Sequence, residues 1–278
     1  MSKKVLLTIL DGWGLATDPA RSAIDQAHTP CIDLLYQQYP HSQLAASEQA
    51  VGLPVGQAGN SEVGHMHLGA GRIVAQPLSR INNTIDSGAF YQNPTLLAAF
   101  AYAKAHQKAV HLMGLVSDGG VHAHLDHLKA LCKAAQDHAV PHLFVHAFTD
   151  GRDTAPQSAL NFLADLKEHL QTTTGQLASV MGRYYAMDRN QHWARTQVAY
   201  NALVHGQGTL AKDWYQAIAQ SYAQGTTDEF LLPIILTDVL GRPRACVQPG
   251  DVVVCFNFRT DRSRQITQVL TQNTPVAT

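Results

Sequence analysis

The sequence of 278 residues has little of several features that mark other classes of protein. Its four cysteines are widely spaced and form no Cys-x-x-Cys pair, which excludes the zinc and redox motifs of that spacing. The formal net charge is -1, so there is no overall attraction for nucleic acid or an anionic membrane. No apolar run approaches the length of a membrane span, and the stretch after the N-terminal lysines is too short for a signal peptide. We therefore expect a cytoplasmic protein without nucleic-acid or membrane partners, whose cysteines are buried free thiols.

Apolar residues are plentiful. They make up 45% of the sequence, against 15% for charged residues, a composition that can bury a substantial core. This length predicts one large or two moderate domains. The regular pattern weakens between residues 71 and 93, so we place a domain boundary between residues 76 and 77, which gives domains 1–76 and 77–278.

Short apolar runs alternate with segments of helical spacing in the second of these domains. This alternation favours βαβ units, and hence an α/β fold with a mostly parallel sheet covered on both faces. A further apolar run, 5–10, predicts a first core strand. The segment 206–250 is less regular and predicts only a strand over 231–236. The other predicted strands are 109–116, 142–148, 177–181 and 251–258, and the predicted helices are 124–138, 156–170 and 193–204.

Charged side chains recur just after the predicted strands. The carboxyl ends of parallel strands meet at one edge of a sheet, where open α/β folds bind their ligands. Arginine at successive strand ends suits a phosphate or carboxylate, because guanidinium groups bind these anions in a bidentate manner. The residues at these ends are His122, Arg152, Asp153, Arg183, Arg189, Arg259 and Arg262.

Ser61 closes a glycine-rich stretch that begins at Gly52. A serine hydroxyl needs activation, and no Gly-x-Ser-x-Gly elbow surrounds this one. A metal ion is the other common means, and Asp11, after the first apolar run, is a hard oxygen ligand. The alternative is a tight glycine turn with a solvent-facing serine. His124 and His127 have a spacing that permits chelation, but we interpret them as surface or capping residues.

The motifs occur in the order found in a known family. Together they resemble the 2,3-bisphosphoglycerate-independent phosphoglycerate mutases of the alkaline-phosphatase-like superfamily. The motifs are Leu10-Asp11-Gly12-Trp13-Gly14, Gly59-Asn60-Ser61-Glu62-Val63-Gly64-His65, Ser117-Asp118-Gly119-Gly120-Val121-His122, Thr149-Asp150-Gly151-Arg152-Asp153, Gly182-Arg183-Tyr184-Tyr185-Ala186-Met187-Asp188-Arg189 and Asn257-Phe258-Arg259-Thr260-Asp261-Arg262.

This resemblance implies a fold, an activity and a set of site residues. The fold is an alkaline-phosphatase-like N-terminal segment followed by an inserted three-layer α/β transferase domain. The activity is that of an isomerase of glycolysis and gluconeogenesis, which interconverts 3-phosphoglycerate and 2-phosphoglycerate through a phosphoserine. Ser61 would be the nucleophile, and Asp11 and Ser61 would be ligands in a site for two divalent metal ions, usually manganese. The residues implied to bind substrate are His122, Arg152, Asp153, Arg183, Arg189, Arg259 and Arg262.

The family also differs from this sequence in length. Its members are nearly twice as long, and the resemblance implies that the remaining metal ligands lie in a C-terminal piece of the phosphatase domain that this chain lacks. We therefore expect the chain alone to be inactive and the whole enzyme to be a monomer. Two other hypotheses stay open: a catalytically incomplete fragment that only binds phosphoglycerate-like anions, and a related metal-dependent phosphomutase or phosphatase.

Overall fold

The computed structural model describes residues 4–272, which fall into two compact units divided after Ser79. The predicted boundary, between residues 76 and 77, lies at the start of helix α4 (Pro77–Asp86). The predicted end of the second domain, at residue 278, lies outside the described residues.

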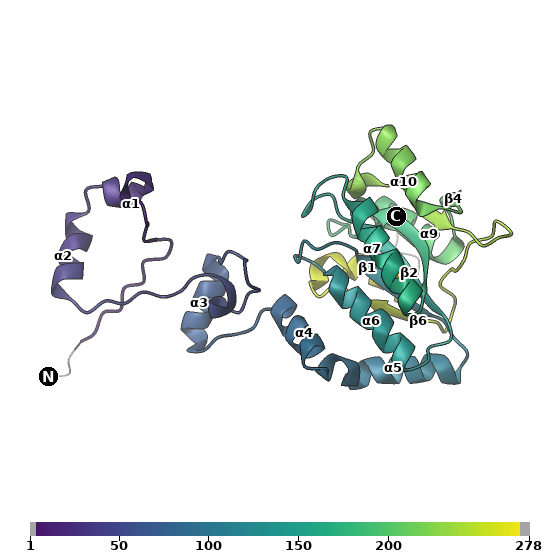
Figure 1. The fold of residues 1–278 in the computed structure, drawn as a ribbon, viewed down its shortest axis with the longest axis horizontal. Helices are drawn as coiled ribbons and strands as arrows, with labels where there is room; N and C mark the ends of the chain where they lie inside the picture. The colour runs from purple at the N-terminus through teal and green to yellow at the C-terminus, as the bar shows by residue number, and fades with distance from the viewer. Residues whose placement is uncertain (1–3, 273–278) are drawn as a thin grey trace. The chain divides into compact units, whose positions relative to one another are not determined.

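The second unit contains a six-stranded sheet with the order β4-β5-β3-β2-β1-β6 (Figure 1). Strands β6, β1, β2 and β3 are mutually parallel, whereas β5 runs antiparallel to β3 and parallel to β4. The mostly parallel α/β sheet predicted from the sequence is thus confirmed. The strands are β1 (Val110–Leu115), β2 (Leu143–Thr149), β3 (Gln176–Gly182), β4 (Thr209–Ala211), β5 (Ile234–Leu236) and β6 (Val252–Cys255).

Helices cover both faces of this sheet. Helices α6 and α7 pack against each other over one face, and α9 packs with α11 on the other (Figure 1). Every residue of β1 is buried, as expected for a strand covered on both sides. The helices of this unit, after α4, are α5 (Pro94–Ala105), α6 (Leu125–Asp137), α7 (Ala159–Thr172), α8 (Arg183–Ala186), α9 (Trp193–His205), α10 (Trp214–Ala223) and α11 (Arg264–Thr271).

The first unit is built differently. Its helices are short, and its core cluster of buried apolar residues consists of Val51, Leu53 and Val63. The predicted strand 5–10 is wrong: these residues form no strand, and the Val5 side chain is 90% exposed. A strand needs a neighbour to pair its backbone groups, and no strand lies among residues 4–79. The α-helices of this unit are α1 (Ala23–Gln26), α2 (Pro30–Gln38) and α3 (Ser61–Ala70).

Two smaller expectations need correction. Cys132 is a buried free thiol as predicted, but Cys246 and Cys255 are only partly buried. Cys31 is exposed, because it lies in the first unit where little is buried. The predicted strand 231–236 is shorter and forms only β5, because Asp228 to Phe230 form a 3-10 turn just before it. Within residues 4–272, no helix is both long and apolar enough to cross a membrane.

Candidate functional site

The loops that follow β1, β2, β3 and β6 meet at the carboxyl edge of the sheet, and they carry every substrate-binding residue predicted for this unit. We call their guanidinium groups the arginine cluster, which consists of Arg152, Arg183, Arg189, Arg259 and Arg262. Contacts link the four loops. His122 Nε2 lies 3.9 Å from Asp153 Oδ2, His122 Nδ1 lies 3.7 Å from Asp261 Oδ1, and Arg183, after β3, is bonded to Asp153. The structure therefore brings the predicted residues of this unit together.

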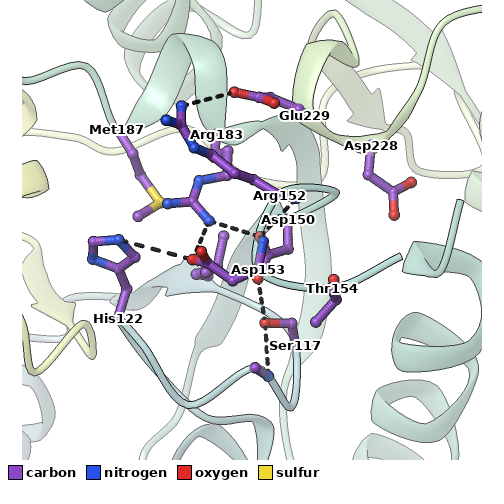
Figure 2. Close-up of polar contacts among 12 residues, drawn as sticks. Ser117, His122, Asp150, Arg152, Asp153, Thr154, Arg183, Met187, Asp228 and Glu229 are labelled. Atoms are coloured by element: carbon purple, nitrogen blue, oxygen red, sulfur yellow. Dashed lines mark hydrogen bonds and ion pairs between the residues drawn. The ribbon is translucent and has the colours of Figure 1, made fainter. Parts of the chain in front are cut away.

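Arg183 is buried at the centre of the site, between two carboxylates (Figure 2). Its Nη1 donates to Asp150 Oδ1 and to Asp153 Oδ2, each at 2.6 Å. Burial alone would raise the pKa of Asp150, but hydrogen bonds from the Asp153 backbone, Ser117 and Arg183 outweigh it and hold the pKa below its ordinary value. Asp150 is thus an ionised structural carboxylate that orients Arg183 and the loop around Asp153.

Asp261, in the loop that follows β6, contacts the loops that follow β1 and β3 through His122 and Arg189. It accepts a hydrogen bond from Arg189 Nη1 at 2.7 Å, and its Oδ1 lies 3.1 Å from Arg259 Nε. Burial acts to raise the pKa of Asp261, but Arg189, Arg259 and His122 together lower it. The carboxylate therefore holds two of the cations in place while leaving each of them partly exposed.

Arg262 is the least satisfied cation of the cluster. Its Nη1 donates to Met187 O at 3.1 Å, whereas its buried Nε has no hydrogen-bond partner among residues 4–272. Burial, followed by repulsion from Arg183 and its neighbours in the cluster, lowers the pKa of Arg262. A bound anion would accept a hydrogen bond from this free donor and would reduce the repulsion between the arginines.

His122 is a neutral donor or acceptor beside these cations. Burial, followed by repulsion from Arg183 and Arg259, lowers its pKa to about 4, although Asp261 and Asp153 act in the opposite direction. Its Nδ1 has no hydrogen-bond partner among the described residues. The ring can therefore donate one hydrogen bond to a ligand without adding a further positive charge.

Cations outnumber carboxylates in this region. The arginine cluster brings five positive charges, and the carboxylates bonded to it bring four negative ones, a balance that leaves one positive charge for an anionic ligand. The carboxylates are Asp150, Asp153, Glu229 and Asp261. Asp150, Glu229 and Asp261 were not among the predicted site residues, because a sequence does not tell which charges at strand ends contact the ligand and which hold the arginines.

The first unit brings Ser61 and Asp11 together. Ser61 is the first residue of α3, and its Oγ donates to Asp11 Oδ2 at 2.6 Å. His65, one helical turn further on, places its Nδ1 3.2 Å from the same Oγ. The helix begins at Ser61 because Asn60 caps it by accepting a hydrogen bond from Val63 N. His65 was not predicted, although its spacing of four residues from Ser61 on a helix was the available signal.

This pair has the donor chemistry of a site for a hard divalent cation, because both atoms are oxygens and both side chains are exposed. A full coordination sphere for manganese takes about six donors. No group of three or more His, Cys, Asp or Glu side chains able to hold a metal is found within residues 4–272. The described residues therefore fit part of a metal site and do not complete one.

The histidines of α6 have structural roles. His124 caps this helix by accepting a hydrogen bond from Asp126 N, which confirms the capping interpretation. His127 is buried, and its Nε2 lies 2.8 Å from Asn82 Oδ1, so the prediction of a surface residue is wrong for His127. Its apolar surroundings in the second unit lower its pKa to about 4 through burial.

The fold and this cluster define an α/β protein with grouped arginines, the side chains suited to a phosphate or carboxylate. The model of the family described as "BPG-independent PGAM N-terminus" matches residues 81–277. The chain therefore belongs to the family of 2,3-bisphosphoglycerate-independent phosphoglycerate mutases.

Curated relatives and a solved structure agree with this family. The chain is 51% identical to the 2,3-bisphosphoglycerate-independent phosphoglycerate mutase of Flavobacterium psychrophilum, over 98% of this chain and 54% of the relative. It is 53% identical to that of Myxococcus xanthus, over 96% of this chain and 52% of the relative. A crystal structure of Leishmania mexicana phosphoglycerate mutase at low cobalt concentration is similar with a TM-score of 0.74 and 30% identity, covering 90% of this chain and 48% of that one. The chain thus spans about half the length of the curated relatives it matches.

Proposed function

We propose that the arginine cluster binds the phosphate and carboxylate of a phosphoglycerate. We further propose that Ser61 accepts the phosphoryl group in an enzyme of the relatives' full length, which interconverts 3-phosphoglycerate and 2-phosphoglycerate. The observation that carries the proposal is Arg262, a cation with an unused buried donor in a group of arginines that repel it. The phosphate and carboxylate of a three-carbon acid are groups that guanidinium side chains bind in a bidentate manner.

The binding roles follow from exposure and existing contacts. Arg259 and Arg189 are each about half exposed, so they can turn toward a phosphate or carboxylate while Asp261 holds their position. Asp153 lies between Arg183 and His122, where it can accept a hydrogen bond from a glycerate hydroxyl and act as its base. Buried Arg183 orients Asp153 and contributes charge.

The proposed reaction uses Ser61 as a relay. Its Oγ forms a bond to phosphorus as the bond between phosphorus and the C3 oxygen breaks, and the released oxygen takes up a proton. The C2 hydroxyl of the retained glycerate then gives its proton to Asp153 and bonds to phosphorus as the bond between phosphorus and Ser61 Oγ breaks, and Ser61 Oγ takes up a proton. Asp11, 2.6 Å from Oγ, is placed to hold the hydroxyl proton before the first step. A relay avoids direct transfer between neighbouring hydroxyls, where the attacking and leaving oxygens cannot lie in line.

Two divalent metal ions, with manganese as our proposal, would supply Lewis-acid polarisation of the phosphate and of the serine hydroxyl. Asp11 and Ser61 would be the ligands from this chain. Since no larger ligand group lies within residues 4–272, we propose that this chain alone has little or no mutase activity. The predictions of a cytoplasmic location and of a monomeric whole enzyme stay predictions.

Two measurements test the proposal. Isothermal titration of the chain with 3-phosphoglycerate tests binding, with glycerol as the uncharged control. Mass spectrometry after incubation with Mn²⁺ and 3-phosphoglycerate tests whether Ser61 becomes phosphorylated, in this chain and in a relative of full length. Saturable binding together with phosphorylated Ser61 in the longer protein supports the proposal, and absence of 3-phosphoglycerate binding contradicts it.

The same measurements separate the alternatives. Binding by the chain without phosphorylation of Ser61 in either protein would favour a fragment that only binds anions. Turnover of phosphopentoses or simple phosphate monoesters, with no action on 3-phosphoglycerate, would favour a related phosphomutase or phosphatase.

A further inference from the structure

We infer that Asp228 is a positioning residue for the arginine cluster. It acts through the 3-10 turn η4 (Asp228–Phe230), which lies between the loops that follow β2 and β3. The choice of 3-phosphoglycerate as the ligand rests on the proposed function, whereas the positioning role of Asp228 does not. Within residues 4–272 Asp228 forms no hydrogen bond or ion pair with an arginine, so its effect has to be transmitted by the backbone that it anchors.

The turn is joined to the loop that follows β2. Thr149 Oγ1 donates to Asp228 O at 2.7 Å, and Asp228 N donates to Pro156 O at 2.9 Å. Gly151, at φ +67, packs so closely that an added Cβ would lie 2.8 Å from both the Asp228 Cβ and the Glu229 N. The residue after this glycine is Arg152, so the backbone that carries Arg152 rests directly on the turn.

The same turn supports the end of β3. Gly182 N donates to Leu231 O at 2.8 Å, just after the turn. A Cβ on Gly182 would lie 2.3 Å from Glu229 O, which shows that the two backbones touch. The next residue is Arg183, which donates hydrogen bonds to Asp150 and Asp153. One turn therefore sets the spacing between the two loops that carry Arg152 and Arg183.

The carboxylate of Asp228 holds this turn in place through hydrogen bonds to α7 and α10. It is fully buried, and its Oδ2 accepts hydrogen bonds from Ser158 N at 2.8 Å and Ala159 N at 2.9 Å at the start of α7. Tyr222 OH donates to its other oxygen. No Lys, Arg or His of residues 4–272 forms an ion pair with it. Burying a carboxylate without a cation is costly, and the donors to both of its oxygens offset that cost.

Figure 2 places Asp228 on the far side of the Arg152 loop from Arg183 and His122, with no dashed contact to the other residues drawn. Burial raises the pKa of Asp228 against the opposing effect of its hydrogen bonds, and burial also raises the pKa of Tyr222, which keeps the phenol a donor. Asp228 therefore stabilises the loops from the side away from the arginine cluster, and the arginines remain free to contact a ligand.

The test compares Asp228→Asn with Asp251→Asn in the complete chain. Asp251 is the control: its buried carboxylate accepts from Ala109 N at 3.1 Å and Gln248 N at 2.9 Å, at the opposite end of the strands, and unlike Asp228 it also lies 3.2 Å from a histidine, His111. In Asp228→Asn an NH₂ group replaces one acceptor oxygen, so the amide cannot accept from both Tyr222 and the α7 backbone. Hydrogen exchange of the ligand-free chain is measured first, followed by titration with 3-phosphoglycerate.

We expect Asp228→Asn to speed exchange in 150–154 and 182–184 by about tenfold or more and to weaken 3-phosphoglycerate binding by about tenfold, roughly the loss of one buried hydrogen bond. Asp251→Asn should lower the melting temperature without either effect. Tyr222→Phe removes one hydrogen-bond donor to Asp228 and should speed exchange in the same segments to a smaller extent. If Asp228→Asn does not fold, Tyr222→Phe serves as the test of the inference.

The outcomes separate this inference from the proposed function. Unchanged exchange in 150–154 and 182–184, or an equal rise in Asp251→Asn, overturns the role of Asp228 whatever the ligand. Faster exchange confined to the Asp228 and Tyr222 variants supports it even if the chain binds no 3-phosphoglycerate, a result that would instead contradict the proposed function.

Discussion

The two units of this chain place reactive side chains in contrasting ways. In the second unit, four parallel strands with a buried core bring the ends of distant loops together, so that residues as far apart as Arg152 and Arg262 share one cluster. In the first unit, Ser61 and Asp11 lie on an exposed scaffold with a small core. The comparison teaches that a parallel sheet gathers charged residues from distant parts of the sequence. A capped helix start, by contrast, can position a serine hydroxyl without any sheet.

The largest effect we expect comes from the first unit. Ser61→Ala should abolish mutase activity and the appearance of a phosphoserine in a relative of full length, because it removes the hydroxyl that is bonded to Asp11. The melting temperature should stay unchanged because the side chain is exposed. Ser47→Ala, at another exposed serine of this unit, is the control. Substantial turnover by Ser61→Ala would rule out the covalent relay.

The next effect belongs to the second unit. Arg259→Ala should weaken binding of 3-phosphoglycerate by roughly 10-fold to 100-fold, the size of a hydrogen bond to a charged group, while the melting temperature changes little. Arg242→Ala removes a more exposed arginine that pairs with Asp238 away from the cluster, and it should leave affinity unchanged. Equal affinities for these two variants and the unsubstituted chain would remove Arg259 from the site.

A third prediction concerns stability against acid. His111 and His146 are buried side by side in the sheet, with 2.9 Å between Nδ1 and Nε2, and they lie between Asp251 and Ser179. Burial, with repulsion from His111, lowers the pKa of His146 from 6.5 to about 3. Between these values the unfolded chain binds a proton that the folded chain does not, so stability is present above pH 6.5 and is lost as the pH falls.

The measurement is the free energy of unfolding in urea at pH 4 to 6.5. His146→Gln should reduce the slope of that free energy with pH by about 1.4 kcal/mol per pH unit, the value for one proton. Exposed His41→Gln should leave the slope unchanged. The carboxylates with lowered pKa, such as Asp150, contribute only near and below pH 3.8, so they do not mask this window. An unaltered slope in His146→Gln would show that the pair is not kept neutral.

The smallest effect compares one kind of cap in both units. Asn60 caps α3 through Val63 N, and Asn93 caps α5 through Thr95 N and Leu96 N. Each change to Ala should cost about 1 kcal/mol. Asn93→Ala should lower global stability, because α5 buries Phe100 in the main core, whereas Asn60→Ala should only speed hydrogen exchange in α3. Equal effects on global stability would mean that the two units unfold together.

The same contrast explains what the sequence revealed. Alternating apolar runs predicted β1, β2, β3 and β6 and their helices, because both the strands and their partners lie within the second unit. The strand predicted over 5–10 does not form, because no strand within residues 4–79 can pair with it. The arginines at strand ends lie together, as expected from the convergence of parallel strands, and their role in binding stays a prediction. Asp228 was not predicted, because its role depends on a turn whose contacts come only from folding.

The central claim is that the cluster at the carboxyl edge of the sheet is one anion site for phosphoglycerate. The most direct measurement is nuclear magnetic resonance of the arginine Nε–H groups during titration of the chain with 3-phosphoglycerate. The account predicts that signals of Arg152, Arg183, Arg189, Arg259 and Arg262 shift together and saturate at one ligand concentration, while Arg242 and Arg244 stay in place. Absence of shifts, or shifts spread over all arginines without saturation, would contradict it.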